Sequence, residues 1–431
     1  MTSHDTGDWL SCYGHATVAT PALDRLASEG CRFANNFCAS PVCTPSRGAM
    51  MTGRYPQSNG LMGLTQTPYR WAYHEGERHA SHIMRDLGYD TALVHHQHEA
   101  RDLNTLGFKE VFRPNEVDLG RSPYERFASG DEVADLAIEY LKGRRSRSAP
   151  FYAQVGFFET HTPYDFGGAP PRKELGFDIP PHVTDDAATR AWYAGLHGAV
   201  ANLDRAVGRI LESLQKFGLA EDTLVIFTVD HGIEIPRAKW QLYDAGIKTA
   251  LLMRWPGGGV SGGRVYDRLV SNVDLLPTVL DLVGSPIPDN MQGIGFAPWF
   301  ADPSSPPRRD AVHAMMHGHF RWYECRCIRT DRYKLIRNFD PSRMRENPAP
   351  LNKRTGTAER PVVELYDLHK DPWELNNLAD DPSLVEVWKH LSGRLWQTLE
   401  EVEDPILKGP VVTPYYRMAM AEYLETNSAQ R

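Results

Sequence analysis

The sequence predicts an α/β protein built on a large, mostly parallel or mixed central sheet that helices cover on both faces. Short runs of β-branched and other apolar residues alternate with stretches in which apolar residues recur every three or four positions. The clearest buried run, residues 224–229, ends in Asp230-His231-Gly232. Polar residues at the carboxyl ends of such strands mark the functional edge of an open α/β sheet.

The other elements of this sheet are predicted in chain order. A helix should begin at Pro21, with Thr20 as its N-cap, because proline is favoured in the first turn and threonine just before it. Residues 89–94 and 151–158 read as further buried strands. Residues 191–214 show apolar spacing of three and four over a length that only a long helix explains.

The composition excludes several classes of partner. The formal net charge of the 431 residues is −8, and no basic tail or stripe argues for a nucleic-acid partner. No apolar run is long enough to span a bilayer, and no signal peptide is visible. The six cysteines do not form a dense disulfide framework, so we expect reduced cysteines in a cytoplasmic protein without a membrane partner. The oligomeric state stays open.

The most informative motif is the run Cys43-Thr44-Pro45-Ser46-Arg47-Gly48, followed by Thr52-Gly53-Arg54. It resembles the signature of the formylglycine-dependent sulfatases of the alkaline phosphatase superfamily. The resemblance implies that a formylglycine-generating enzyme oxidises Cys43 to an aldehyde, whose hydrate attacks sulfur with one oxygen and expels sulfate with the other. Arg47 lies four residues on, where a helical turn brings it back towards Cys43. The plain alternative is a buried cysteine that packs as a small apolar residue.

The same resemblance implies a site for one divalent cation. Asp5 matches the second of two metal-binding aspartates, and His4 stands where the first is expected, so ligation by His4 and a place beside the ligands are both open. Asp230 and His231 match the other half of the site. The predicted ligands are therefore Asp5, Cys43 in its oxidised form, Asp230, His231 and His4. Ca²⁺ is the first choice by resemblance, and nitrogen ligands make Mn²⁺, zinc or iron alternatives.

Residues 88–98, which read Gly-Tyr-Asp-Thr-Ala-Leu-Val-His-His-Gln-His, resemble the second signature of the family. His98 matches the histidine that should bond the diol and help to remove its proton. His96 replaces a lysine that binds the diol and the sulfate. If His96 binds sulfate as a cation, the rate should fall as its imidazole loses a proton near neutral pH. A zinc site built from His95, His96 and His98 is the weaker alternative.

Two further residues resemble the groups that contact the ester in this family. His161, in Glu159-Thr160-His161-Thr162-Pro163, resembles the histidine that contacts the bridging oxygen, where a general acid must protonate the leaving group. Lys239, four residues before Tyr243, resembles a lysine that binds the sulfate. The plain alternatives are a loop-packing histidine and a solvated loop lysine.

The later part of the chain looks like the small C-terminal antiparallel sheet and closing helix of the sulfatases. Its strands are expected over residues 333–336 and 364–368. We therefore divide the chain into a catalytic α/β domain, 1–310, and a C-terminal subdomain, 311–431.

The resulting hypothesis is a sulfatase that hydrolyses a sulfate ester or a sulfamate. The stretch 56–64 looks like the heparan N-sulfatase branch more than the arylsulfatases, which favours a sulfated sugar as the substrate. A phosphonate or phosphate monoester hydrolase on the same scaffold is the first alternative. A catalytically dead sulfate- or glycan-binding protein is the second, supported by His4 and His96.

The N-terminus carries one more expectation. In the family the first metal aspartates follow a buried strand, whereas here only Met1-Thr2-Ser3 precede His4. We expect that a central strand is missing, that the true start lies upstream, and that a restored segment raises thermal stability. A lost segment could also hold a signal peptide.

Overall fold

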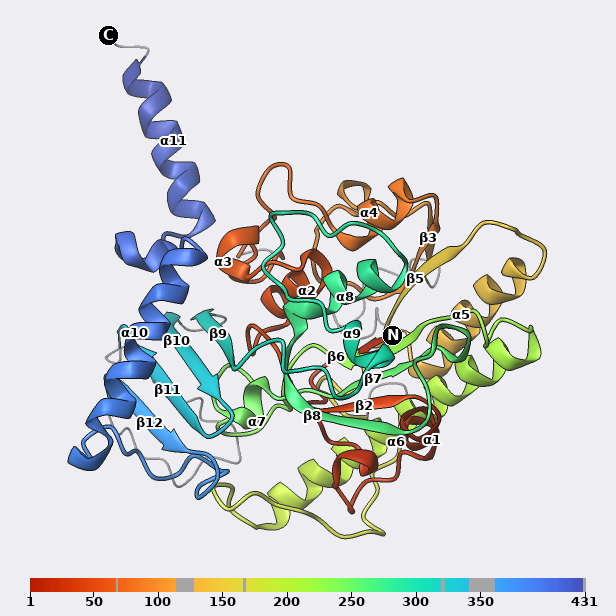
Figure 1. The fold of residues 1–431 in the computed structure, drawn as a ribbon, viewed down its shortest axis with the longest axis horizontal. Helices are drawn as coiled ribbons and strands as arrows, with labels where there is room; N and C mark the ends of the chain where they lie inside the picture. Colours follow the sequence, from red (N-terminus) through yellow and green to blue (C-terminus); the bar gives the residue numbers. More distant parts are fainter. Residues whose placement is uncertain (67–68, 114–127, 166–167, 319–321, 341–360, 429–431) are drawn as a thin grey trace.

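The computed structural model describes residues 1–66, 69–113, 128–165, 168–318, 322–340 and 361–428 (Figure 1). Its centre is an eight-stranded sheet of order β4-β3-β5-β1-β6-β7-β2-β8. Strand β7 is antiparallel to both of its neighbours, and the other strand pairs are parallel, so the sheet is mixed. The strands are β1 (Thr2–Ser3), β2 (Cys31–Phe37), β3 (Asp90–His95), β4 (Glu110–Phe112), β5 (Phe151–Gly156), β6 (Val225–Val229), β7 (Leu251–Arg254) and β8 (Arg264–Ser271).

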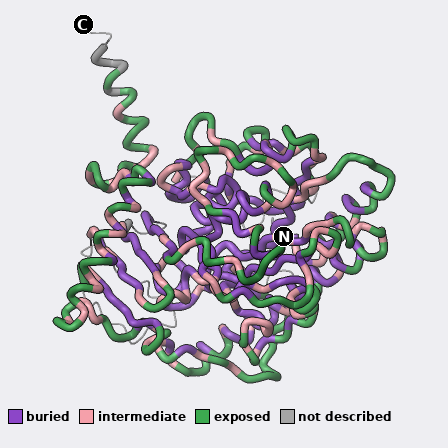
Figure 2. The backbone as a smooth tube through the Cα atoms, viewed as in Figure 1, coloured by how far each residue is buried: buried purple, intermediate pink, exposed green. Residues whose placement is uncertain are grey.

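Helices cover both faces of this sheet, as the alternating pattern predicts. Three of them, α1 (Pro21–Glu29), α5 (Gly130–Arg144) and α6 (Ala187–Lys216), pack on one face in a single apolar core. The opposite core contains α2 (Cys43–Thr52), α4 (Ala80–Asp86), α8 (Leu275–Leu282) and α9 (Pro298–Ala301). The strands run through the buried centre between these layers (Figure 2).

Strand β6 shows how one nearly continuous apolar run packs against the helices on both faces of the sheet. Val225, Phe227 and Val229 belong to the core under α6, whereas Ile226 packs against the core under α8. Successive side chains of a strand point to opposite faces, so a strand that is covered on both sides is apolar at most positions. The exception in β6 is Thr228, whose hydroxyl donates to the Ala250 carbonyl at 3.0 Å.

Strand β1 is two residues long and lies between β5 and β6. Thr2 pairs with Gly156 on one side and with Thr228 on the other, and Ser3 pairs with Val229. The expectation that a central strand would be missing is therefore wrong, because Thr2 and Ser3 make it.

The start of α1 corrects a second expectation. Thr20 does precede Pro21, but its hydroxyl bonds Ser11 and Asp24 and caps no backbone N–H of the helix. The N–H groups of the first turn donate instead to Asp204 of α6, at 3.1 and 2.8 Å. A carboxylate suits this position because the helix dipole is positive there.

A four-stranded antiparallel sheet of order β12-β11-β10-β9 follows, as expected. Its strands are β9 (Ala311–Gly318), β10 (Trp322–Thr330), β11 (Tyr333–Asn338) and β12 (Val363–Asp367). Helix α10 (Val385–Glu401) packs on it through leucines, and α11 (Pro414–Ser428) projects from the body (Figure 1). The short helices are α3 (Pro56–Asn59) and α7 (Asp244–Ile247). In the described part of the chain, no helix combines the length and the apolar character that a membrane span requires.

Candidate active site

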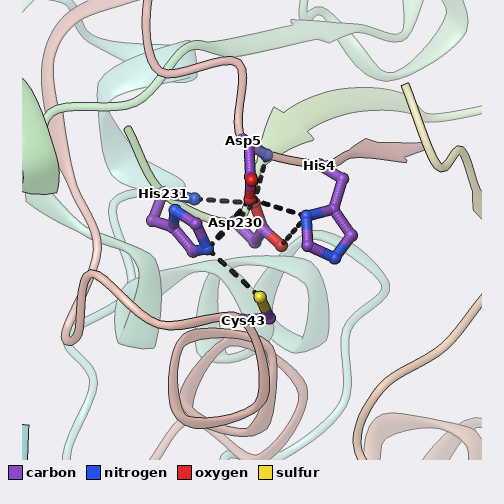
Figure 3. Close-up of side chains that lie close together, drawn as sticks. All are labelled: His4, Asp5, Cys43, Asp230 and His231. Carbon is purple, nitrogen blue, oxygen red and sulfur yellow. Dashed lines mark hydrogen bonds and ion pairs between the residues drawn. The ribbon is translucent and has the colours of Figure 1, made fainter. Parts of the chain in front are cut away.

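Five buried side chains converge at the carboxyl end of the central sheet (Figure 3). One ligand atom from each lies within 4.8 Å of the others. Two follow β1, two follow β6, and the last opens α2. They are His4, Asp5, Asp230, His231 and Cys43. We call this group the carboxylate cluster.

The register of two parallel strands brings the aspartates together. Ser3 of β1 pairs with Val229 of β6, so the residues that follow both strands emerge at the same edge. The backbone of Asp5 then turns into the left-handed region, with φ of 53°, and its N–H donates to Asp230 Oδ1 at 2.9 Å. Residues far apart in the chain thus supply both carboxylates.

Helix α2 positions the reactive cysteine and a buried arginine. Cys43 is its first residue, and Arg47 lies one turn later. The predicted return of Arg47 to Cys43 takes a specific form: Arg47 Nε donates to Asp230 Oδ2 at 3.0 Å, and its Nη2 donates to the Ser3 carbonyl at 3.2 Å. The guanidinium therefore fixes one carboxylate of the cluster and ties α2 to β1.

A second contact locks α2 to β6. The Ser46 hydroxyl donates to the Asp230 carbonyl, and Asn272 Nδ2 donates to both oxygens of Ser46 at 3.0 Å. The motif serine is thus a structural link between the helix and the strand that carries Asp230.

Cys43 sits in a cationic environment. Its Sγ lies 3.4 Å from His231 Nε2. Burial alone would raise the pKa of the Cys43 thiol, but His4 and His231 hold it well below its usual value. Thiolate character makes a cysteine reactive, so this thiol differs from the inert buried cysteine of the plain alternative.

The carboxylate cluster is crowded. His4 Nδ1 lies 2.7 Å from Asp5 Oδ1 and 3.4 Å from Asp230 Oδ2, and His231 Nε2 lies 3.1 Å from Asp5 Oδ1. Burial lowers the pKa of His4, but Asp230, Cys43 and Asp5 together raise it to about 10. The anionic groups thus hold a proton on this buried imidazole.

This donor set fits a divalent cation. Two carboxylates, two imidazoles and the Cys43 side chain face one another without solvent. Buried negative charges need a partner of opposite charge, and protons on the histidines meet that need when no cation is bound. Oxygen-rich ligation suits Ca²⁺, and the imidazoles also suit softer ions.

Lys239 lies on the other side of Asp5. Its ammonium contacts Asp5 Oδ2, and lies 3.3 Å from His161 Nε2 and 3.4 Å from Glu234 Oε2. Burial would lower the pKa of Lys239, but Asp5 and Glu234 raise it above its usual value. Lys239 is therefore a buried cation and not the solvated lysine of the plain alternative.

His161 completes this side of the site. Its ring stacks on Phe158 with centroids 4.9 Å apart, and Nδ1 donates to the Thr162 carbonyl at 2.6 Å. Burial and the charge of Lys239 lower the pKa of His161 to about 4. In the substrate-free protein the imidazole is thus neutral, and its Nε2 accepts from Lys239.

The histidines after β3 divide into two groups. His95 is turned away from the site: its Nδ1 donates to the Gly156 carbonyl at 3.0 Å, and its Nε2 accepts from the Ala128 N–H at 2.9 Å. The suggested zinc site of His95, His96 and His98 is therefore wrong, because His95 bonds backbone elsewhere.

His96 and His98 face His4 instead. The ring centroid of His4 lies 5.4 Å from that of His96 and 6.3 Å from that of His98. Burial, Arg47 and His4 lower the pKa of His96 well below its usual value. The expectation of a His96 cation near neutral pH is therefore not met in the substrate-free protein, and its contact with sulfate stays a prediction.

The structure brings every predicted site residue to one place: Cys43, Arg47, His96, His98, His161, Lys239, Asp5, Asp230, His231 and His4. Three acidic or amide groups beside them were not predicted from the sequence. Glu234 contacts Lys239 and accepts from Thr162 Oγ1 at 2.9 Å, and Gln66 Oε1 lies 2.8 Å from His98 Nε2. Buried Glu99 accepts from the His98 N–H at 3.1 Å. Glu234 and Glu99 carry a signal in the sequence, since Glu234 follows the Asp230 motif by two positions and Glu99 directly follows His98.

Comparisons with known proteins place these residues in context. The family model described as Sulfatase matches residues 3–285. The model described as N-sulphoglucosamine sulphohydrolase, C-terminal, matches residues 237–347. All ten predicted site residues fall within the first of these matches.

Curated relatives match nearly the whole chain. An ulvan-active sulfatase of Formosa agariphila is 26% identical, over 91% of this chain and 73% of its own length. Human N-sulphoglucosamine sulphohydrolase is 25% identical, over 95% of this chain and 91% of its own. Human arylsulfatase A is 27% identical, over 89% of this chain and 84% of its own length.

Solved structures share the fold. One, a complex with its substrate D-glucosamine-2-N,6-O-disulfate, superposes with a TM-score of 0.74 at 19% identity, over 95% of this chain and 98% of the other. A second, described as a 2-O GAG sulfatase, gives a TM-score of 0.75 at 20% identity, over 96% of this chain and 93% of the other. The central sheet, its helical layers and the small C-terminal sheet are thus a shared architecture.

Proposed function

The chain belongs to the sulfatase family, and we propose that it hydrolyses a sulfate ester or a sulfamate of a sulfated sugar. The observation that carries the proposal is the position of Cys43. It opens α2 beside two aspartates and His231, and the Lys239–His161 pair lies across Asp5. A nucleophile precursor, a cation site and a buried lysine–histidine pair thus occupy one edge of the sheet.

Several similarities support a sugar substrate. The second family model bears the name of a sulfohydrolase of N-sulfated glucosamine and covers the segment with Lys239. The first curated relatives act on ulvan by name, and one structural neighbour holds a disulfated glucosamine. We infer that the substrate is a sulfated sugar, and that N- and O-sulfates compete as candidates.

The cation proposed for this site is Ca²⁺, with Mn²⁺ or another softer divalent ion as the alternative. Asp5, Asp230, His231, His4 and the oxidised Cys43 would hold it. Members of the family generally use formylglycine and a divalent metal; together these supply an activated oxygen nucleophile and offset the charge of the sulfate. Oxidation of Cys43 would require a formylglycine-generating enzyme as maturation partner.

The protein side chains then have separable roles. Arg47 keeps Asp230 in place, and its charge limits the repulsion between the carboxylates. His98 offers Nδ1 as a proton acceptor, because Gln66 Oε1 holds a proton on Nε2. Lys239 donates to His161 Nε2, and its ammonium can stabilise the negative charge that develops on the leaving oxygen or nitrogen. Donation of a proton to that atom stays the role predicted for His161. His96 contacts the sulfuryl group as a neutral hydrogen-bonding partner.

The test is release of inorganic sulfate by protein produced with a formylglycine-generating enzyme. Glucosamine N-sulfate, glucosamine 6-O-sulfate, an aryl sulfate and the matching aryl phosphonate form the panel. We expect turnover of at least one sulfated sugar that exceeds turnover of the phosphonate, and none in Cys43→Ala. Faster phosphonate hydrolysis would favour the alternative monoester hydrolase, for which the Asp230-His231 pair is the supporting feature. Binding without turnover would favour the glycan-binding alternative.

A further inference from the structure

Three histidines form a second group of convergent ring nitrogens beside the carboxylate cluster. We propose that His4, His96 and His98 bind a second divalent cation of the Zn²⁺ type. One ring nitrogen of each lies within 4.8 Å of the others. His4 and His96 are buried, and His98 is half-buried. The cluster draws on β1 and on the loop after β3, which are separate parts of the chain.

The contacts of His98 are those of a metal ligand. Its Nε2 lies 2.8 Å from Gln66 Oε1, and an amide oxygen only accepts, so Nε2 carries the proton. Nδ1 therefore keeps its lone pair. That Nδ1 atom is buried and has no hydrogen-bond partner. A histidine that binds a metal commonly donates its other N–H to an amide or carboxylate oxygen, as His98 does.

His4 shows the same division between its two nitrogens. Nδ1 faces the carboxylates of Asp5 and Asp230, at 2.7 and 3.4 Å, and the other nitrogen points away from them (Figure 3). This is the carboxylate–histidine pairing that orients a metal ligand. Binding requires the second nitrogen to lose its proton, and the charge of the cation then replaces the charge of that proton.

A third group of possible metal ligands in the site does not suit a cation, because a lysine already lies among its members. Asp5, His161 and Glu234 also bring their ligand atoms within 4.8 Å of one another. However, the ammonium of Lys239 contacts all three and takes the position that a cation would need. The charged neighbour that acts on His96 is Arg47, whose guanidinium donates to Asp230 Oδ2 at 3.0 Å.

The ligand chemistry selects the class of ion. Three imidazole nitrogens suit Zn²⁺ and its borderline neighbours, whereas Ca²⁺ prefers oxygen. Three protein ligands also leave one coordination position open. When both cations are bound, His4 binds the second through its other ring nitrogen and keeps the Nδ1 proton on the carboxylates, so Asp5, Asp230, His231 and the oxidised Cys43 hold the first cation. The two cations would then lie next to each other.

One consequence rests on the proposed function. His96 and His98 are the residues that should meet the sulfuryl group and the nucleophile, so an ion bound to them blocks those contacts. Zn²⁺ should therefore inhibit sulfate release in competition with the substrate. The binding test below needs no turnover, so failure of the sulfatase proposal and failure of the second site give different results.

Cobalt(II) is the probe, because its visible d–d absorption reports coordination by nitrogen ligands. Full-length protein preloaded with Ca²⁺ is titrated with Co²⁺, and bound metal is counted by elemental analysis. The titration is repeated in Cys43→Ala, where a cysteine–cobalt band cannot arise. We expect Co²⁺ to bind beyond the first equivalent of metal and to be displaced by Zn²⁺.

Substitutions show which residues bind this second equivalent of metal. His98→Ala and His96→Ala should lose it and keep the first equivalent, which also shows that they are folded. Gln66→Ala should weaken it by about 10- to 100-fold, the usual effect of removing the partner of a metal-bound histidine. His390→Ala, at an exposed position of α10, should change nothing. Absence of a second equivalent in the parent protein, or its persistence in His98→Ala, would overturn the proposal.

Discussion

Two buried groups of charges in this molecule are built in opposite ways. At the small sheet, Arg326 and Asp404 form a closed pair: Arg326 Nε and Nη2 donate to the two carboxylate oxygens at 2.5 and 3.0 Å. Nη1 donates to the carbonyls of Met316 and Cys325, and Asp404 also accepts from the Ile406 N–H. Each charge meets its partner within the protein.

The carboxylate cluster is open by comparison. Asp5, Asp230 and Cys43 crowd together, and their negative charges raise the pKa of His4 and of His231 against the effect of burial. Among the described residues, Arg47 and Lys239 bring permanent positive charge to these carboxylates. The comparison teaches that buried charge alone does not mark a functional site; the mark is buried charge that needs an ion from outside.

Asp230→Asn, in the carboxylate cluster, should cause the largest loss of metal binding and of sulfate release. The amide keeps the acceptor for the backbone N–H groups but removes one negative ligand charge. We expect loss of the bound cation and at least about a 100-fold loss of sulfate release, because metal activation fails. Elemental analysis and initial rates measure both effects.

The control for that variant is Asp281→Ala, at an exposed position of α8. It should retain metal and activity. Stoichiometric metal in Asp230→Asn would show that the cluster is not the cation site.

Arg326→Met, in the closed pair, should lower stability and leave sulfate release unchanged. Breaking a closed buried pair leaves Asp404 charged and unpaired, which costs about 3–5 kcal/mol in the free energy of unfolding. Sulfate release per folded molecule should stay unchanged, because Arg326 donates to Asp404 and to the Met316 and Cys325 carbonyls and not to a residue of the cluster. Denaturant unfolding measures the first and rates on folded protein the second.

The double variant Arg326→Met/Asp404→Leu sharpens the same point. It removes both charges and should recover part of the stability that Arg326→Met loses. If the double variant is less stable by the sum of the two single losses, the groups are not a coupled pair.

The closed pair also predicts a dependence of stability on pH. Burial would raise the pKa of Asp404, but Arg326 holds it below its usual value. A carboxyl with a lowered pKa stabilises the folded state above its unfolded pKa, about 4, and that contribution is lost as the pH falls through the folded value. The difference in unfolding free energy between the parent and Asp404→Asn should therefore shrink below about pH 4. A constant difference across this range would contradict the pairing.

The smallest effect on sulfate release is expected from changes at Glu234, which contacts Lys239 at the edge of the carboxylate cluster. Glu234 is one of two carboxylates on Lys239, and its side chain is 22% exposed. Solvent screens this contact, so Glu234→Gln should lower sulfate release by about 5-fold, equivalent to about 1 kcal/mol. Thr162→Val, which removes the hydroxyl on the same carboxylate, is the matched variant and should have a smaller effect. A change in Glu234→Gln as large as in Asp230→Asn would place Glu234 among the cation ligands.

The features that local sequence encodes were predicted well. Strand β6 with Asp230 after it, and the helical turn from Cys43 to Arg47, follow from one short apolar run and one motif. The mixed central sheet and the small antiparallel sheet were likewise predicted.

The missed features depend on residues that only the fold brings together. Arg47 bonds Asp230 across 183 positions, and the Arg326–Asp404 pair spans 78. Neither partner signals the other in the sequence. The same holds for Gln66, which sets the proton position on His98, and for His4, which replaces His95 in the histidine group. Roles that depend on orientation or on pKa therefore required the structure.

The most direct test of the account relates sulfate release to the chemical state of Cys43. Preparations with different fractions of oxidised Cys43, quantified by peptide mass spectrometry, are assayed on the same sulfated sugar. We expect the rate per molecule to rise in proportion to the oxidised fraction and to be zero when that fraction is zero. A rate that does not depend on the oxidised fraction, or full activity in Cys43→Ala, would contradict it.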